Sequence, residues 1–324
     1  MLTKKRKGFR LQSLSIIFSF LNEEDVLAEL IRRVRLSVKP EIGKTISSYR
    51  MIFINDASTD NSLDILLSEK ANHNDLTILT TSRRFGVSRC VLAGIAHTKT
   101  DLIVYMDADL QDPPELIPRL IKAQISEKTE VVHTQRFKRV GESPVKKIWN
   151  RMGYAILTRV TGGMIIPEVG DFKLISRKVA TYLCATKDSN PFLRGLVQSI
   201  GFRQTTIQYE REVRFSGDTK FPLFGPRVIA NFLDSALISF STAPLKWALF
   251  LGFATSFFSF IYLLAVVAMK FAGISIPGWS AIMATILFLG GIQLFTIGIL
   301  GLYVGSIHEQ IKDRPRVIID RVID

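Results

Sequence analysis

The chain has 324 residues, enough for one domain of about 200 residues and further segments. Its formal net charge is +13, so anionic lipid headgroups or anionic substrates are expected to attract it. No nucleic-acid-binding motif accompanies this charge, and no nucleic acid is expected as a partner. The two cysteines, Cys90 and Cys184, lack the spacing of a metal site, which predicts reduced, buried thiols of a cytoplasmic domain.

The amino-terminal residues 1–13 form a basic tail that is able to contact lipid. The apolar run 14–21 imitates part of a signal peptide, but it is short, and the acidic segment 22–25 follows it at once. No small-residue cleavage site is present. We therefore predict a first strand at 14–20 and then a helix that Asn22 caps, with acidic residues in its first turn, where they suit the helix dipole.

Short apolar segments alternate with helical segments through the next part of the chain. Strands are predicted at 14–20, 50–54, 76–80, 102–106 and 130–134. Helices are predicted after the first four of these strands, and the second helix begins at Asp60 or Asn61. This alternation is typical of an α/β fold with a mostly parallel sheet and right-handed crossovers. Two more strands are predicted at 172–176 and 202–209.

Two further helices are predicted on the carboxyl-terminal side of this domain. Apolar residues recur at helical spacing between 148 and 160 with basic residues among them, which predicts a helix that either lies on the membrane or packs on the sheet. Pro226 begins another helix with one apolar face. Because this helix directly precedes a long apolar run, we predict an interfacial helix at 226–243 rather than a core helix. The domain before it is predicted to span 14–225.

Two long apolar runs follow, and they predict transmembrane helices at 244–271 and 280–307. Each run exceeds the roughly 20 residues needed to cross about 30 Å of hydrocarbon. Two such runs in succession disfavour the alternative of a buried core helix. Basic residues flank the pair, so the positive-inside rule predicts a hairpin with both ends in the cytoplasm and a cytoplasmic tail at 308–324. We expect a multi-pass protein of the bacterial inner or plasma membrane, with its catalytic domain in the cytoplasm.

Acidic residues gather directly after the fourth predicted strand. Asp107, Asp109 and Asp112 lie within six residues, and Pro113 ends any further strand. In an open α/β sheet, ligands bind at the carboxyl ends of the strands, so these acids are expected in a binding site. A divalent cation with a phosphate-bearing ligand would neutralise them, and oxygen ligands without a nearby His or Cys favour Mg²⁺ or Mn²⁺ at Asp107 and Asp109. The alternative is a solvated acidic turn.

Other polar residues stand at similar places. Asp56 ends the second strand and is able to accept hydrogen bonds from a base or ribose; a turn with a helix cap is the alternative. Asp171 precedes an apolar strand, where it faces a reacting carbon or is a loop acid. Three cations before the interfacial helix suit a lipid phosphate, although generic attraction to anionic lipid is the alternative. These cations are Arg211, Arg214 and Lys220.

Several motifs together resemble the family 2 glycosyltransferases, in the branch that transfers sugar to polyprenyl phosphate. This branch includes bactoprenol glucosyltransferases, the aminoarabinose transferase and dolichyl-phosphate mannose synthases. The resemblance runs from about Leu14 to the carboxyl end and includes the two-span hairpin. The motifs are Leu-Asn-Glu-Glu at 21–24, Asn-Asp-Ala-Ser-Thr-Asp at 55–60, Arg-Phe-Gly at 84–86, Asp-Ala-Asp-Leu-Gln-Asp-Pro-Pro-Glu at 107–115 and Gly-Asp-Phe at 170–172.

The resemblance implies a GT-A type, Rossmann-like sheet and an inverting transfer from a nucleotide sugar to undecaprenyl or another polyprenyl phosphate. It makes Asp109 the metal ligand, with Asp107 on the metal or the nucleotide sugar. Asp171 becomes the acidic residue near the acceptor, to which the family often gives the base role. Arg211, Arg214 and Lys220 would hold the lipid phosphate. The nucleotide-sugar site would comprise Asn22, Glu23, Asp56, Ser58, Arg84, Gly86, Asp107, Ala108 and Gln111.

The chain departs from the family pattern in two places near the nucleotide. Ser19 stands where the first strand usually has Pro, and Arg84 stands where relatives often have Asn. The donor is therefore less determined than the reaction: UDP-glucose is the first expectation, and mannose or aminoarabinose the alternatives. A processive synthase is disfavoured because the Gln-x-x-Arg-Trp motif is absent. An inactive membrane scaffold and a homo-oligomer are left open.

Overall fold

The computed structural model describes residues 11–136, 169–188, 191–210, 243–273, 278–312 and 314–324. The chain divides into two compact units. The first comprises residues 1–158, 162–222 and 314–324, and the second comprises 159–161 and 223–313. Each unit is described by itself.

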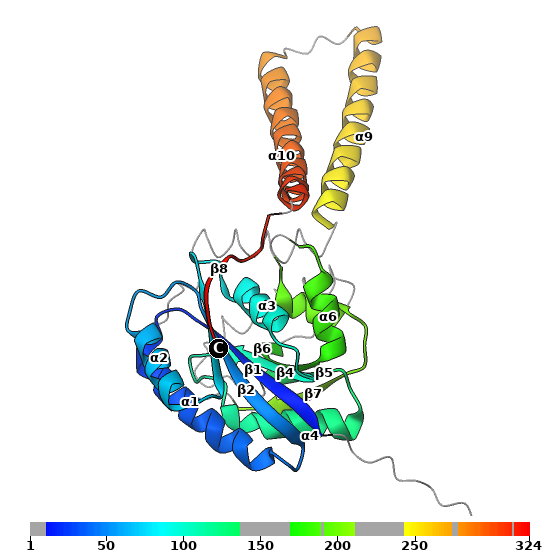
Figure 1. Cartoon of the computed structure of the whole chain (residues 1–324). Helices are drawn as coiled ribbons and strands as arrows, with labels where there is room; N and C mark the ends of the chain where they lie inside the picture. The colour runs from blue at the N-terminus through cyan, green and yellow to red at the C-terminus, as the bar shows by residue number, and fades with distance from the viewer. Residues whose placement is uncertain (1–10, 137–168, 189–190, 211–242, 274–277, 313) are drawn as a thin grey trace, which may run out of the picture. The chain divides into compact units, whose positions relative to one another are not determined.

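An eight-stranded sheet with strand order β7-β5-β6-β4-β1-β2-β3-β8 forms the centre of the first unit (Figure 1). Strands β4, β1, β2 and β3 are parallel to one another. Strand β6 is antiparallel to β4 and β5, whereas β5 and β7 are parallel. The strands are β1 Gln12–Phe20, β2 Ile46–Asn55, β3 Leu76–Thr81, β4 Leu102–Asp107, β5 Val131–Arg136, β6 Val169–Ser176, β7 Gln204–Tyr209 and β8 Ile319–Ile323. The prediction of a mostly parallel α/β sheet is thus confirmed.

Helices cover both faces of this sheet. Helices α1 and α4 pack on the face that carries Phe18 of β1, whereas α3, α6 and α7 pack on the face that carries Ile17. Helix α3 approaches closely, because a Cβ on Gly94 would lie 2.7 Å from Ile17 Cγ2. The helical elements are α1 Glu24–Val38, η1 Lys39–Glu41, α2 Ser62–Asn72, α3 Val87–His97, η2 Pro114–Leu116, α4 Ile117–Glu127, α6 Arg177–Ala185 and α7 Leu193–Ser199.

Three local predictions are wrong. Asn22 does not cap α1: it has φ +55°, and its side chain accepts a hydrogen bond from the Thr59 amide at 2.8 Å. The carboxylate of Asp60 instead accepts from the amide of Glu24, the first residue of α1, at 3.2 Å, and from Ser62 at the start of α2. Asp171 lies inside β6 rather than before a strand, because β6 begins at Val169 to pair with β5. Cys184, in the last turn of α6, is exposed, whereas Cys90 is buried as predicted.

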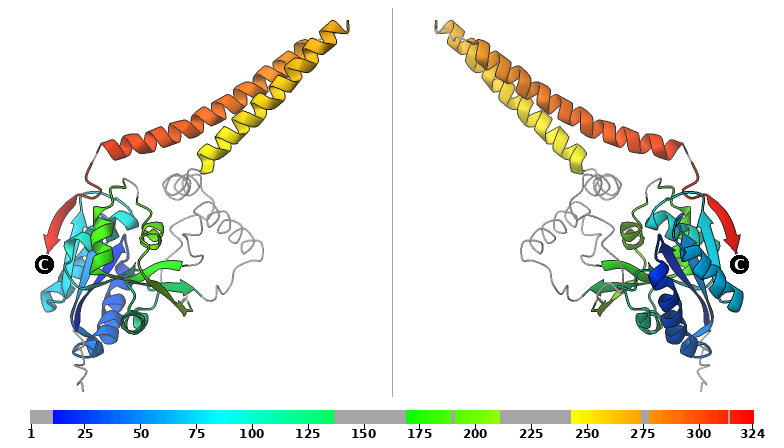
Figure 2. Two further views of the ribbon diagram at one scale, coloured as in Figure 1. Left: turned by 90° about the vertical axis from the view of Figure 1, so that its right-hand side faces the viewer. Right: turned by 90° about the vertical axis from the view of Figure 1, so that its left-hand side faces the viewer.

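The carboxyl-terminal segment contains a strand that the sequence analysis did not assign. Strand β8 pairs antiparallel with β3 and ends the sheet, where Figure 2 shows it in red. Its side chains do not alternate strictly between apolar and polar, and the strand has only 5 residues, so its sequence pattern is weak. The sheet therefore combines residues from both ends of the chain.

The second unit contains two long helices, α9 Ala243–Phe271 and α10 Trp279–Ile311. Both are long and apolar enough to cross a membrane, over Pro244–Met269 and Ala284–Ile311. They contact each other, and their side chains along these stretches are largely exposed in the isolated chain. Helix α10 continues four residues beyond the predicted end at 307. The predicted helices at 148–160 and, apart from residue 243, at 226–243 lie outside the described residues.

Candidate active site

Strand register places the ends of three central strands at one edge of the sheet. Ser19 of β1 pairs with Asp107 of β4, and Phe20 pairs with Asn55 at the end of β2. Asp56 follows Asn55 directly, and its amide donates to the Phe20 carbonyl at 3.0 Å. The acids of two separate motifs thus end strands on either side of β1. This is the edge where parallel α/β sheets bind ligands.

The turn after β4 presents Asp109. Leu110 has φ +55°, and the carboxylate of Asp109 accepts a hydrogen bond from the Gln111 amide at 3.1 Å through Oδ1. An aspartate that bonds the backbone two residues on stabilises a tight turn. Ala108 is buried, so the two aspartates around it hold fixed positions on the backbone.

The carboxyl group of Asp107 lies in a strongly acidic environment. Burial raises its pKa to about 7, with further contributions from the charges of Asp171, Asp109 and Asp112 that outweigh the opposite effect of Arg136. Within the described part of the chain, no group donates a hydrogen bond to the Asp107 carboxylate. Ionising a buried carboxyl group that has no hydrogen-bond donor costs free energy, and a bound cation would lower that cost.

Arg194 of α7 pairs with Asp171. Its Nε and one terminal nitrogen donate to the two carboxylate oxygens at 3.2 and 2.5 Å, which is a bidentate arrangement. Burial alone would raise the pKa of Asp171, but the charge and hydrogen bonds of Arg194, with help from Lys173 and Arg136, lower it below the ordinary value. Asp171 is therefore held as a carboxylate.

A row of polar side chains crosses the sheet next to this pair. Lys173 pairs in register with Tyr105 of β4 and with His133 of β5. All three side chains are buried. Burial lowers the pKa of Lys173 to about 7, and burial together with the Lys173 charge lowers the pKa of His133 to about 4. The Nζ of Lys173 lies 3.5 Å from the backbone carbonyl of Arg194, so the lysine links β6 to α7.

A second buried cluster contacts the acidic turn after β4 through Asp112. Tyr209 of β7 donates a hydrogen bond to Asp112, and Arg136 of β5 lies 3.6 Å from the other carboxylate oxygen. The Arg136 Nε also donates to the Tyr209 hydroxyl at 3.3 Å. A Cβ on Gly170 would lie 3.3 Å from this guanidinium, so glycine leaves room for it. The cluster joins the turn after β4 to strands β5, β6 and β7.

Asp56 has a different environment from Asp107. It is buried, and its two carboxylate oxygens accept hydrogen bonds from the backbone amides of Phe85 and Gly86 at 2.6 and 2.9 Å. Gly86 has φ +92°, a conformation that glycine adopts without strain, and α3 begins at the next residue. Asp56 therefore fixes the 82–86 loop across the edge of the sheet.

The carboxyl-terminal segment holds the other end of this loop. The Ser82 amide donates to the Ile318 carbonyl at 3.0 Å, one residue before β8 begins. Within the loop, the Arg83 guanidinium lies over the Phe85 ring at 4.3 Å, whereas Arg84 is exposed. The loop is thus anchored at both ends and presents Arg84 to solvent.

The profile of the family described as Glycosyl transferase family 2 matches residues 15–183, which is more than half of the chain. The chain belongs to glycosyl transferase family 2. The match covers β1 to β6 and therefore both acidic strand ends and Asp171. The predicted family is confirmed, and the chain is a glycosyltransferase.

Relatives of this family 2 glycosyltransferase are similar along almost its whole length. The glycosyltransferase YkcC of Bacillus subtilis (strain 168) is 37% identical over 95% of this chain and 93% of its own length. The prophage bactoprenol glucosyl transferase homolog of Escherichia coli (strain K12) is 30% identical, over 95% and 99%. The bactoprenol glucosyl transferase of Shigella phage SfX is 30% identical, over 94% and 98%.

Among solved structures, this chain is similar to glucosyl-3-phosphoglycerate synthase from Mycobacterium tuberculosis, in complex with Mn²⁺, uridine diphosphate and phosphoglyceric acid, with 18% sequence identity. The similarity covers 68% of this chain and 78% of that chain, with a TM-score of 0.48.

The donor set of this glycosyltransferase suits a hard divalent cation. Among the described residues, no group of three or more His, Cys, Asp and Glu side chains could hold a metal ion. Asp107 and Asp109 offer two carboxylates, and none of the described residues donates a hydrogen bond to the carboxylate of Asp107. Mg²⁺ usually binds through one or two carboxylates, with substrate phosphates and water completing the site. The two aspartates would therefore fit Mg²⁺ or Mn²⁺, with a diphosphate and water supplying the other ligands.

The structure brings most of the predicted site residues to one edge of the sheet. The Asn22 amide donates to the Ser58 hydroxyl at 3.0 Å, and the Glu23 amide donates to Ser62 at 2.9 Å, so these residues join the loops after β1 and β2. The carboxylate of Asp56 is already engaged by the 82–86 loop. The predicted lipid-phosphate residues lie outside the described residues: Arg211, Arg214 and Lys220.

Sequence reasoning missed the partners of the acids. Arg194 is 23 residues from Asp171 on a separate helix, and no local spacing links them. Lys173 looks like a surface lysine between apolar neighbours, although strict alternation in β6 would have placed it on the same face as Asp171. Asp112 stands in the recognised motif, but its bond to Tyr209 joins residues that lie 97 positions apart.

Proposed function

We propose that this glycosyltransferase transfers a sugar, with glucose as the first candidate, from a nucleoside diphosphate sugar to undecaprenyl or another polyprenyl phosphate. Transfer takes place at the cytoplasmic face of the bacterial plasma membrane, and α9 and α10 span that membrane. The combination of an acidic strand-end site with two membrane-length helices in one chain carries the proposal. The similarity to bactoprenol glucosyl transferases over more than nine-tenths of the chain supports the lipid acceptor and glucose.

Asp107 and Asp109 would hold Mg²⁺ or Mn²⁺, which supplies positive charge for the departing nucleoside diphosphate. The loops after β1, β2 and β3 surround the same edge and would bind the nucleotide. In that arrangement Asp56 positions the 82–86 loop, since both of its carboxylate oxygens accept hydrogen bonds from backbone amides of that loop. Arg84 is exposed in this loop and would reach the donor phosphates.

Asp171 acts as an anion rather than as a proton acceptor in this proposal. Arg194 lowers its pKa, and a carboxylate of low pKa is a weak base at neutral pH. The acceptor needs little base, because a phosphate monoester with a second pKa of about 6 is largely dianionic at pH 7. Asp171 instead orients the acceptor and stabilises positive charge that develops on the sugar. A single displacement by the phosphate oxygen inverts the anomeric carbon.

The membrane helices supply proximity. A polyprenyl phosphate is confined to the bilayer. Because the catalytic unit is joined covalently to a spanning hairpin, it stays near the membrane surface and meets the lipid there without a search in three dimensions. The cations Arg211, Arg214 and Lys220 are expected to bind the lipid phosphate there.

Membranes that contain the protein test the proposal directly. Radiolabelled UDP-glucose, GDP-mannose and UDP-aminoarabinose are each supplied with undecaprenyl phosphate and Mg²⁺ or Mn²⁺, and the lipid-extractable label is measured. We expect label from UDP-glucose, no label with Asp109→Ala, and an inverted anomeric configuration in the product by NMR. Preference for another sugar would correct the donor alone. Absence of any lipid-linked product, with the protein folded and in the membrane, would contradict the proposal.

A further inference from the structure

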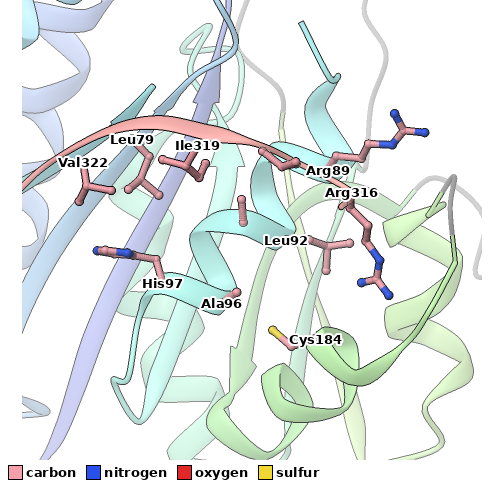
Figure 3. Close-up of a pocket in the computed structure, with 11 residues that line it drawn as sticks. Leu79, Arg89, Leu92, Ala96, His97, Cys184, Arg316, Ile319 and Val322 are labelled. Atoms are coloured by element: carbon pink, nitrogen blue, oxygen red, sulfur yellow. The ribbon is translucent and has the colours of Figure 1, made fainter. Parts of the chain in front are cut away.

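A pocket of about 470 Å³ lies outside the candidate active site, between α3 and the carboxyl-terminal segment (Figure 3). Its volume falls in the range of about 300–1,000 Å³ that is usual for small-molecule sites. Neither the acidic turn nor the 82–86 loop contributes to its lining. The pocket therefore has no assigned role in the sugar transfer.

Aliphatic side chains form the walls of this pocket. Leu92 and Ala96 come from α3, Leu79 from β3, and Ile319 and Val322 from β8. These residues offer no hydrogen-bonding side chain, so the walls suit a hydrocarbon chain better than a sugar or a base.

The two ends of the pocket differ in charge. Arg89 of α3 and Arg316 lie at one end, and His97 lies at the other (Figure 3). The His97 Nε2 lies 3.5 Å from the carboxylate of Asp324, so an acidic group stands at that end. In the part of the chain that the structure describes, Arg316 forms no ion pair. Two arginines beside an apolar wall match a phosphate joined to a hydrocarbon chain, because one guanidinium group can donate two hydrogen bonds to a phosphate.

The sequence connects this cationic end to the membrane hairpin. Arg316 follows Ile311, the last residue of α10, by five positions, which an extended chain covers in about 17 Å. Basic residues immediately cytoplasmic of a membrane helix attract anionic lipid headgroups. The position of Arg316 thus favours a lipid over a soluble phosphate ester.

We propose that the pocket between α3 and β8 binds an anionic phospholipid, with an acyl chain along the aliphatic wall and the phosphate between Arg89 and Arg316. The inference rests on the membrane-spanning role proposed for α9 and α10, and it is independent of which sugar is transferred. The bound lipid is a second ligand beside the polyprenyl acceptor. It would join α3 to the segment that precedes β8, whose Ile318 holds the 82–86 loop.

Cys184 offers a probe of occupancy, because it lines the pocket and is exposed, whereas the other cysteine, Cys90, is buried. The full-length protein is placed in nanodiscs of phosphatidylcholine alone or of phosphatidylcholine with phosphatidylglycerol. The rate of Cys184 modification by the uncharged reagent N-ethylmaleimide is measured in both, and the ratio of the two rates is compared between variants. The ratio removes any effect of a substitution on the thiol itself.

We expect modification about tenfold slower in the phosphatidylglycerol nanodiscs, as for a site that is about nine-tenths occupied. The double substitution Arg89→Gln with Arg316→Gln should bring the ratio close to one. The matched control is Arg119→Gln, which removes an exposed arginine of α4 on the other face of the sheet and should keep the full protection. Both variants are measured in the same two bilayers. A general effect of bilayer charge on the reagent or on the thiol is therefore the same for both variants and cancels when their rate ratios are compared.

Equal modification rates in the two lipids, or equal protection in the double variant and the parent, would overturn the proposal. Circular dichroism of each variant separates loss of the pocket from loss of the fold. Failure of the protein to enter nanodiscs would instead contradict the membrane role of α9 and α10. Sugar transfer measured on the same nanodiscs reports on the proposed reaction, so its failure is distinguishable from failure of lipid binding.

Discussion

Asp56 and Asp107 lie at the carboxyl ends of β2 and β4, on either side of β1, but their carboxyl groups have opposite surroundings. The carboxylate of Asp56 accepts two backbone amides from the 82–86 loop. The carboxylate of Asp107 accepts no hydrogen bond within the described residues, and its nearest charged neighbours include three other aspartates. An acid whose oxygens are satisfied stabilises the protein around it, whereas an acid without donors is costly unless a ligand supplies positive charge.

The comparison assigns a different task to each acid. Asp56 fixes the 82–86 loop, and both of its carboxylate oxygens have hydrogen-bond donors without any ligand. Asp107, Asp109 and Asp171 form an acidic group whose charge Arg194, Lys173 and Arg136 offset in part. Structures often retain such an unfavourable arrangement at functional sites. The predictions below test this division, from the largest expected effect to the smallest.

Removing a metal ligand should have the largest effect. Asp109→Asn keeps the size of the side chain and removes its charge, so transfer should fall by at least about 10²–10³-fold, the usual loss when one electrostatic contact to the transition state is removed. Transfer is measured against Mn²⁺ concentration. Asp64→Asn, at an exposed position on α2, is the control and should leave transfer unchanged. Full activity of Asp109→Asn in chelator would refute the ligand role.

Asp107 should make the metal-free protein less stable as pH rises. Its folded pKa, about 7, lies above the value near 3.9 expected in the unfolded chain, so the folded state binds more protons between these values. The free energy of unfolding therefore decreases from about pH 4 to pH 7, by roughly 3–4 kcal/mol. Asp107→Asn should remove this decrease.

Melting temperatures of parent and Asp107→Asn in detergent, at pH 5 and pH 8, measure the effect. The melting temperature of the variant relative to that of the parent should be higher at pH 8 than at pH 5. Added Mn²⁺ should reduce this difference, because it stabilises the parent alone. A difference between the two proteins that is the same at both pH values would show that Asp107 is not strained by its neighbours.

Arg194→Gln should change the pH dependence of transfer. Without this arginine, burial and the neighbouring acids raise the pKa of Asp171, so more of it is protonated near neutral pH. Transfer at pH 6 should fall relative to the parent, because a larger fraction of Asp171 is protonated there, and the deficit should narrow as pH rises. Arg194→Lys keeps the charge and should restore part of the loss. An unchanged shape of the pH profile would contradict this role.

Asp56→Asn should have the smallest effect, on stability and on donor binding. The amide oxygen keeps one of the two backbone hydrogen bonds, and its NH₂ group opposes the other, for a cost of about 1 kcal/mol. The loop then loses its fixed conformation, so the donor KM should rise more than kcat falls. A loss of kcat as deep as that of Asp109→Asn would place Asp56 with the reacting groups instead.

The amino-acid sequence by itself determined the features that depend on local order. Apolar runs and their lengths gave the central strands and the two long helices, because burial and span length are properties of contiguous residues. The acids at 56 and at 107–109 follow such strands directly, so their common edge could be predicted from the parallel alternation alone.

Only the tertiary structure decided what each acid meets. The pairing of Asp171 with Arg194, the bonds of Asp56 to the 82–86 loop and the position of β8 beside β3 join residues that lie 23 or more positions apart. No periodicity specifies such contacts, since they depend on how helices and strands pack once the chain has closed on itself. Aspartate is therefore a hydrogen-bonded structural residue at 56, whereas at 107 it lies among other acids and its pKa is raised.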